Sequence, residues 1–315
     1  MARSAFIFLT FILLSSCSEP KTKPFKLAIN PWPGYEFLYL AEQLGLYKQV
    51  NLDIEIIQVS TLADGQRAYL NGQVDGFAST LVEAVQIEAL GAPPVEIILL
   101  PDYSNGGDVI LADKAFSSIA DLKGATIGCE VNSVGLYFLA RALEKSNLSI
   151  TDIKIKNIEQ HQGFDALQSK EIDAFISYPP YSLKIQNNPQ YRQIFSSADI
   201  PSEILDVLSI SKEVLLAHPA LKAKLQKVWT LAINYHQQYP DKANKIMAQR
   251  EGISVAEFES ALNDLKVLDL AEQRAIVKTN RVSELALSVC KTLTKIHSIS
   301  SDCTHTEHII NMETF

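Results

Sequence analysis

The sequence predicts an α/β protein of two similar lobes, each built on a mostly parallel sheet covered by helices. Short apolar runs alternate with amphipathic segments from Phe25 onward, which is the pattern of βαβ units. The pattern starts again after residue 124, and two similar segments, Val74–Phe77 and Ile172–Phe175, fall at the same place in the two series, 98 positions apart. Four residues can match by chance, so the prediction of two similar lobes depends on the motif occurring at the same place in both series.

The first series contains four predicted strands and three predicted helices. Each strand is a short apolar run, and each helix has its apolar residues at helical spacing. We expect strands at 25–30, 52–59, 74–79 and 95–100, and helices at 36–45, 62–70 and 80–90.

The second series follows the same rules and ends in a helical region. We expect strands at 125–129, 153–158 and 172–177, helices at 133–147 and 163–169, and a short helix after Pro180. A strand at 204–209 precedes helices at 220–238, 241–249, 255–262 and 271–296, which should pack back on the first lobe. The last eighteen residues, 298–315, are polar, and we expect them to be a frayed, flexible tail.

The first sixteen residues have the pattern of a secretory signal. Arg3 precedes an apolar run from Ala5 to Leu14 that is too short for a permanent membrane span. The residues up to Cys17 (LSSC) resemble a bacterial lipobox, in which the cysteine is acylated and becomes the first residue of a lipoprotein. We expect lipidation of Cys17 and a tether at 17–24, hence a position outside the cytoplasmic membrane; an ordinary signal peptide is the alternative.

Composition excludes some partners. The formal net charge is −8, or −9 once Arg3 is removed with the signal, and Lys and Arg do not cluster. Phosphate backbones are poor partners for such a chain, so we expect no nucleic-acid binding. We also expect a monomer that needs no cofactor.

We expect the three remaining cysteines to have structural roles and no catalytic or metal-binding role. Cys129 lies in an apolar run and is expected to be a small buried side chain. Cys290 and Cys303 could pair in an oxidising compartment or stay free. Cys303, His305 and His308 could bind a metal, but their polar setting offers no support, and we expect no metal site.

Four short motifs together resemble a known family. They are Trp32–Tyr35 after the first strand, Gly72–Asp75 before the third, Asp121–Gly124 before the second series, and Ile172–Phe175. In this order and spacing the chain, from Phe25 to about Leu287, resembles the NitT/TauT type of ABC-transporter substrate-binding proteins, which includes sulfonate-binding proteins and domains related to thiamine-pyrimidine synthase.

The resemblance implies a type II periplasmic-binding fold. Lobe 1 would comprise residues 25–108 and 200–297, and lobe 2 residues 109–199, with hinge crossovers near 101–108 and 199–209. Such a protein closes on a small solute and delivers it to a membrane permease. The alternative hypothesis is a sensor that reports its ligand to a membrane kinase. Members of the family take nitrate, sulfonates, pyrimidines and other small solutes, so the resemblance selects none of them.

Enzymes of related fold are disfavoured. Thiamine-pyrimidine synthases carry a cysteine-rich iron motif, whereas the corresponding half of this chain has only Cys129. Menaquinone-pathway enzymes have no reason to be exported. The segment Asn132–Gly135 resembles part of a nucleophile elbow, but Val131 replaces the first glycine. We therefore expect no catalytic residues.

Candidate ligand contacts in lobe 1 follow the carboxyl ends of strands, where open α/β sheets bind ligands. Trp32 and Tyr35 lie in a loop stiffened by two prolines and could cover an apolar or cationic group, or pack the loop. Ser79 and Thr80 open a helix, where hydroxyls can contact a ligand or merely cap.

The hinge and lobe 2 supply the other candidates. Asp102 and Asp108 flank a glycine-containing loop, and Asp108 in the cleft would favour an amino or guanidino group. Asn132 and Ser133 begin a helix and could face an anion, while Tyr178 could close the site from the second lobe. An aromatic pair, a helix N-terminus and a carboxylate suggest a small zwitterion or an amine-bearing acid.

Overall fold

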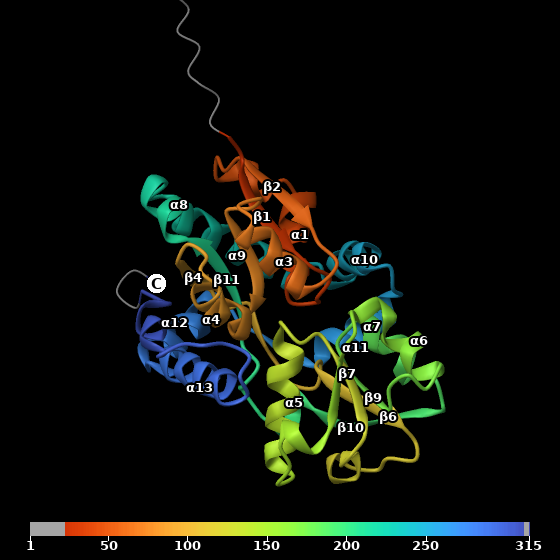
Figure 1. The fold of residues 1–315 in the computed structure, drawn as a ribbon. Coiled ribbons are helices and arrows are strands. Elements are labelled where there is room, and N and C mark those ends of the chain that lie inside the picture. Colours follow the sequence, from red (N-terminus) through yellow and green to blue (C-terminus); the bar gives the residue numbers. More distant parts are fainter. Residues whose placement is uncertain (1–22, 312–314) are drawn as a thin grey trace, which may run out of the picture.

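The computed structural model describes residues 23–311 and 315 and consists of two lobes (Figure 1). The predicted signal segment and Cys17 lie outside the described residues. Within residues 23–311, no helix has the length and apolar character needed to cross a membrane.

Lobe 1 is a five-stranded sheet, ordered β2-β1-β3-β11-β4, with helices on both faces (Figure 1). Apart from the short helix α2, which was not predicted, its elements agree with the predicted ones to within a few residues. They are β1 (Phe25–Ile29), α1 (Glu36–Gln43), α2 (Leu46–Gln49), β2 (Ile54–Gln58), α3 (Leu62–Leu70), β3 (Gly76–Thr80), α4 (Leu81–Ala89), β4 (Val95–Leu99) and β11 (Asp206–Ser211).

Lobe 2 repeats this arrangement in the order β10-β6-β9-β7-β8. Two of its strands, β6 and β10, were not among the predicted ones. Its elements are β6 (Val109–Asp113), β7 (Thr126–Cys129), α5 (Val134–Lys145), β8 (Lys154–Asn157), α6 (Gly163–Gln168), β9 (Ala174–Ser177), α7 (Tyr181–Gln186) and β10 (Tyr191–Ser196).

Each sheet contains one reversed strand in the same place. β11 is antiparallel to both β3 and β4, and β6 is antiparallel to both β9 and β10, while the other pairs are parallel. Each reversed strand is the first strand after a crossover from the other lobe. The expectation of two similar, mostly parallel lobes is therefore confirmed.

The repeated motif has one structural role in both lobes. The Asp75 carboxylate accepts a hydrogen bond from the backbone N–H of Lys26 at 2.8 Å, and Asp173 does the same for Thr126, also at 2.8 Å. Each aspartate thus ties the entrance of one strand to that of its neighbour. Phe77 and Phe175 are completely buried, as predicted for both positions.

Two crossovers connect the lobes and lie side by side. The outgoing one forms β5 (Asp102–Ser104), which pairs with β12 (Leu265–Val267) from the C-terminal region. The returning one passes next to it, since Ser104 N–H donates to Ile204 at 3.0 Å and Tyr103 forms a bridge with Leu205. This pair of strands is the structural connection that the hinge prediction requires.

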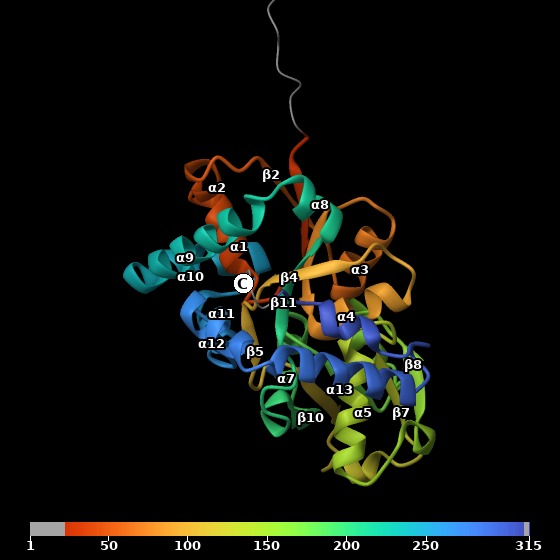
Figure 2. The same ribbon diagram turned by 90° about the vertical axis from the view of Figure 1, so that its left-hand side faces the viewer.

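The C-terminal helices cover lobe 1 and reach lobe 2. They are α8 (Lys212–Ala217), α9 (Leu221–Gln238), α10 (Pro240–Glu251), α11 (Val255–Asn263), α12 (Leu270–Lys278) and α13 (Arg281–Lys295). The single helix expected at 271–296 is two helices, because Asn280 adopts a left-handed conformation with φ of 60°. Figure 2 shows α13 running beneath α4 and beside α5.

Residues 298–311 are held against lobe 1, where a frayed tail was expected. A disulfide joins Cys290 of α13 to Cys303, and Ile309 and Ile310 are buried. Ile310 also forms a bridge with Ile97 of β4. The polar composition of this segment predicted a frayed tail because it did not reveal that one disulfide and two buried isoleucines hold the segment on the lobe. Cys129, by contrast, is a free and buried thiol, as predicted.

Candidate functional site

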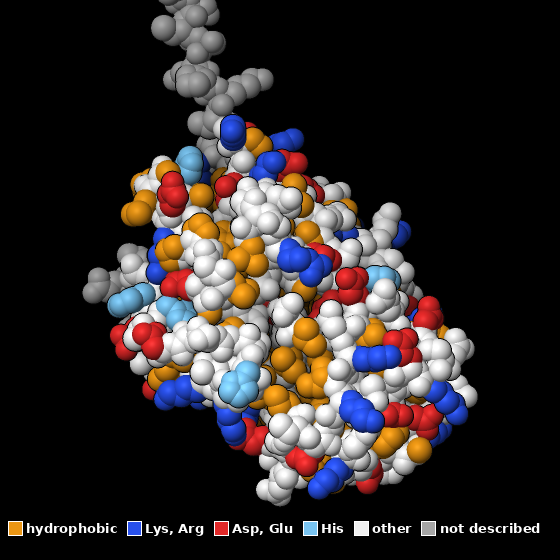
Figure 3. All heavy atoms as spheres, viewed as in Figure 1, with side chains coloured by type: hydrophobic (Ala, Val, Ile, Leu, Met, Phe, Trp, Pro, Cys, Tyr) orange, Lys and Arg blue, Asp and Glu red, His pale blue; other side chains and the backbone are white. Residues whose placement is uncertain are grey.

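A small cavity lies where the two lobes meet, at the carboxyl ends of β1 and β3. It is lined by Asn30, Trp32, Tyr35, Leu62, Thr80, Asp108, Tyr178 and Asp206. The open space is about 10 Å³, enough for about one water molecule. The lobes are therefore closed on each other, and the face shown in Figure 3 has only a shallow furrow, with hydrophobic side chains beside it.

A wider groove lies elsewhere, at the outer end of lobe 1 between Pro24 and His218. It contains none of the predicted site residues and is formed largely by connecting segments. The predicted site residues that line a cavity all line the one between the lobes.

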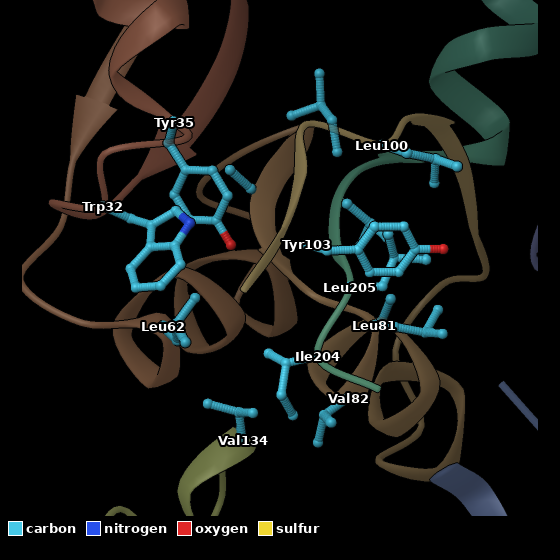
Figure 4. Packing of buried hydrophobic residues seen from close by; sticks show 14 of the residues in the cluster. Trp32, Tyr35, Leu62, Leu81, Val82, Leu100, Tyr103, Val134, Ile204 and Leu205 are labelled. Atoms are coloured by element: carbon cyan, nitrogen blue, oxygen red, sulfur yellow. The ribbon is translucent and has the colours of Figure 1, made fainter. Parts of the chain in front are cut away.

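Aromatic rings form one wall of the cavity. Trp32 lies 6.4 Å from Tyr35 and 6.0 Å from Tyr178 between ring centroids, and the pair with Tyr178 is edge-to-face. Tyr178 belongs to lobe 2, so this pair joins the lobes, and its hydroxyl has no hydrogen-bond partner. Figure 4 shows Trp32 and Tyr35 side by side above Leu62. Gly107 permits the indole's position, because a Cβ there would lie 2.8 Å from the ring.

A pair of aspartates lies behind the aromatic loop. Asp102 accepts a hydrogen bond from the indole N–H of Trp32 at 3.3 Å, and Asp206 accepts one from the Tyr35 hydroxyl. Both carboxyls are fully buried, and the Oδ2 atom of each has no hydrogen-bond partner. Burial raises the pKa of Asp102 to about 7, and burial together with the charge of Asp102 raises that of Asp206 well above its usual range.

Asp108 is the second carboxylate of the cavity. Its backbone N–H donates to Ser104 Oγ at 3.1 Å, which fixes the residue at the start of β6, and its side chain is 3% exposed. The Oδ2 atoms of both Asp108 and Asp206 have no hydrogen-bond partner. Burial raises the pKa of Asp108 to about 7, with a further contribution from the charge of Glu83.

The hydroxyls at the end of β3 have local partners. Thr80 Oγ1 accepts from Val82 N–H at 3.1 Å and so caps α4, while one side of this residue lines the cavity. Ser79 Oγ donates to the Thr80 carbonyl at 2.9 Å and is fully buried in the sheet. Of these two candidates, only Thr80 reaches the cavity.

The start of α5, which was predicted to face an anion, faces a carboxylate of the protein itself. Asn132 is exposed and does not line the cavity. Ser133 is buried, and its hydroxyl donates to Glu83 of lobe 1 at 2.7 Å. Val134 N–H donates to the same carboxylate oxygen at 2.7 Å. A carboxylate of the protein itself thus occupies this helix terminus.

Comparison with known proteins places the chain in a family. The family model described as NMT1/THI5 like matches residues 32–243, which is more than half of the chain. The chain belongs to the NMT1/THI5-like family. This agrees with the resemblance to NitT/TauT-type substrate-binding proteins, whose motifs lie largely within the matched range.

Individual relatives of this NMT1/THI5-like chain are distant. A Brucella abortus protein named as a binding protein is 24% identical over 294 residues, covering 89% of this chain and 88% of that protein. A Haemophilus influenzae protein named for thiamine biosynthesis is 27% identical over 144 residues, 46% of each chain. The alkanesulfonate-binding protein SsuA of Xanthomonas axonopodis, solved with MOPS, shares the fold with a TM-score of 0.77 at 18% identity, over 92% of this chain and 99% of that one.

In this family member, sequence reasoning missed several cavity residues. The charged one that lines the cavity is Asp206, and Glu83 lies behind the lining, bonded to Thr80; both lie within elements predicted from their apolar residues. A detectable signal existed in both cases, since an acidic residue inside an otherwise apolar strand or helix needs a buried partner. Asn30 and Leu62 gave no comparable signal.

Among the residues that the structure describes, no group of three His, Cys, Asp or Glu side chains could hold a metal ion. The cysteine of the tail trio considered above, Cys303, is in the disulfide.

Proposed function

We propose that this chain is the solute-binding component of an ABC importer and that its solute carries a protonated amine. The family, the two-lobed fold and the full-length likeness to a binding protein support the first part. The solute would lie between Trp32, Tyr35 and Tyr178 and would bridge the lobes, so that binding favours the closed form that the permease recognises.

One observation carries the choice of an amine. The Oδ2 atoms of Asp108 and Asp206 are buried, lack partners and belong to residues of the same aromatic-lined cavity. In the described part of the chain, no Lys, Arg or His lines this cavity. Buried carboxylates need a cation or a proton, and aromatic faces favour cations as well. An ammonium group would satisfy both requirements.

The space available implies motion. Room for about one water cannot hold an organic solute, so the Trp32–Tyr178 contact must open before loading. The two adjacent crossovers allow the lobes to separate as hinged bodies, and an amine would then take the position between the carboxylates on closure.

The N-terminal segment and the disulfide support a location outside the cytoplasm. We propose that Cys17 is lipidated and holds the protein at the extracytoplasmic face of a membrane. The Cys290–Cys303 disulfide supports an oxidising compartment. Export also disfavours a biosynthetic enzyme, although the Haemophilus relative bears the name of a thiamine biosynthesis protein.

The test is direct identification of the solute. Native mass spectrometry of protein purified without denaturation should release a small amine, and a thermal-shift panel of amines, amino acids and sulfonates should show stabilisation by amines. Asp108→Asn and Trp32→Ala should weaken that response, whereas Asp53→Asn, an exposed aspartate at the opposite end of β1, should leave it unchanged. Stabilisation by sulfonates or nitrate alone would reject the amine.

A further inference from the structure

Glu83 connects the two lobes through a single buried carboxylate. It lies in the first turn of α4 in lobe 1 and is fully buried. Oε2 accepts from the backbone N–H of Thr80 at 3.0 Å and from its hydroxyl at 2.5 Å. Oε1 accepts from Ser133 Oγ and from Val134 N–H, both at 2.7 Å. Both carboxylate oxygens are therefore fully used, one in each lobe.

The position of Oε1 is that of a bound anion. Val134 is the first residue of α5, a helix of twelve residues, whose N-terminal amides carry partial positive charge. A hydroxyl and a backbone amide that converge on one oxygen form the donor set that a carboxylate, sulfonate or nitrate group would use. Figure 4 shows Val134, at the start of α5, facing Val82 of α4 and Ile204 of the returning crossover.

Glu83 lies next to the cavity, since Thr80, whose hydroxyl donates to it, lines that cavity together with two unpartnered polar groups. Asp108 and Tyr178 are 3% and 2% exposed, and Asp108 Oδ2 and the Tyr178 hydroxyl have no partner. Both feel the charge of Glu83. An anionic solute placed here would compete with Glu83 for the same donors and would also face Asp108.

We propose that Glu83 determines specificity by serving as a built-in anion: it fills the oxyanion position at the start of α5, so the cleft rejects sulfonate-like and nitrate-like solutes and accepts cations. The inference rests on the proposed solute-binding function and specifies the class that the site excludes. It also assigns Glu83 a role that capping of α4 alone would not need, because only Oε2 serves that helix.

The experiment removes the built-in carboxylate and supplies a free one. Glu83→Ala deletes four heavy atoms and leaves room for formate or nitrate beside Ser133 and Val134. Formate and nitrate should stabilise this variant saturably, with at least about tenfold tighter binding than to the unchanged protein, since two charge-assisted hydrogen bonds are regained. Glu83→Gln, which fills the same space without charge, is the matched control and should gain nothing. Chloride at equal ionic strength corrects for general salt effects.

Two results would overturn the inference. One is a Glu83→Ala protein that binds formate and nitrate no better than Glu83→Gln does; Glu83→Ser replaces it if the alanine variant does not fold. The other is saturable binding of methanesulfonate or nitrate to the unchanged protein, which needs no variant at all. Anion rescue does not depend on amine binding, so an amine panel without hits would remove the proposed solute class while leaving the rescue result intact.

Discussion

Replacing Asp108 by asparagine should stabilise the ligand-free protein at pH 8 while weakening its binding of amines. Burial raises the pKa of Asp108 from 3.8 to about 7. The folded protein therefore binds a proton that the unfolded chain has released between about pH 4 and pH 7, and folding stability decreases as pH rises through that window. A pKa difference of this size corresponds to about 4 kcal/mol at most, because one unit is about 1.4 kcal/mol.

The asparagine side chain has nearly the same shape and carries no charge, so it removes this loss. At pH 5.5 the folded carboxyl is protonated but the unfolded one is not, so about half of this loss is already present and the variant should be more stable than the parent protein by at most about 2 kcal/mol. At pH 8 the variant should be more stable by about 1–4 kcal/mol. The difference can fall below the maximum because the charges of the neighbouring Glu83, Asp102 and Asp206 change together with that of Asp108.

Urea unfolding at pH 5.5 and pH 8, followed by tryptophan fluorescence and by circular dichroism, measures both differences. Asp53→Asn, an exposed aspartate, is the control and should show no such divergence. An Asp108→Asn protein that is less stable than the parent at pH 8 would show that the carboxylate is stabilised by the fold, and the reasoning about an unsatisfied, ligand-seeking charge would be wrong.

Three further substitutions probe other features. Gly34→Ala should destabilise the protein by about 1–3 kcal/mol in urea unfolding, because its Cβ would lie 1.8 Å from Asp102 Oδ2. Cys290→Ser should lower the unfolding free energy by about 3 kcal/mol under oxidising conditions and should make the chain end accessible to protease. Under reducing conditions, where the disulfide of the parent protein is also broken, the two proteins should have the same unfolding free energy. Arg250→Met should cost about 3–5 kcal/mol at pH 8, since it leaves Glu36 buried without its cation, and the cost should shrink as pH falls. Equal losses at both pH values would contradict this account.

The alternation of strands and helices was sufficient to predict both lobes, because hydrophobic periodicity depends only on local sequence. Helix α3 was predicted at its observed bounds, 62–70. The strands β6 and β10 were missed since each depends on pairing with distant segments, and β10 has a mixed burial pattern. The Cys290–Cys303 link was left open because spacing alone does not fix the distance between two cysteines.

Five of the residues predicted to bind a ligand line the cavity, and their role in binding stays a prediction. Trp32, Tyr35, Thr80, Asp108 and Tyr178 all line the cavity, because strand ends and crossovers can be located from the pattern of elements. Ser79 and Asn132 do not, since side-chain direction at a strand end depends on a single residue of register.

The fold alone does not determine the charge of the solute that the cleft prefers. The SsuA protein of Xanthomonas axonopodis binds alkanesulfonates and shares the two-lobed architecture at 18% identity. In this chain α5 begins where the lobes meet, and helix N-termini favour anions. A binding protein for cations must therefore neutralise at least one terminus. A fixed carboxylate such as Glu83 does so and also adds negative charge toward Asp108 and Tyr178. Under this proposal, one acidic residue on the opposite lobe sets the preferred charge of the solute without altering a strand or a helix.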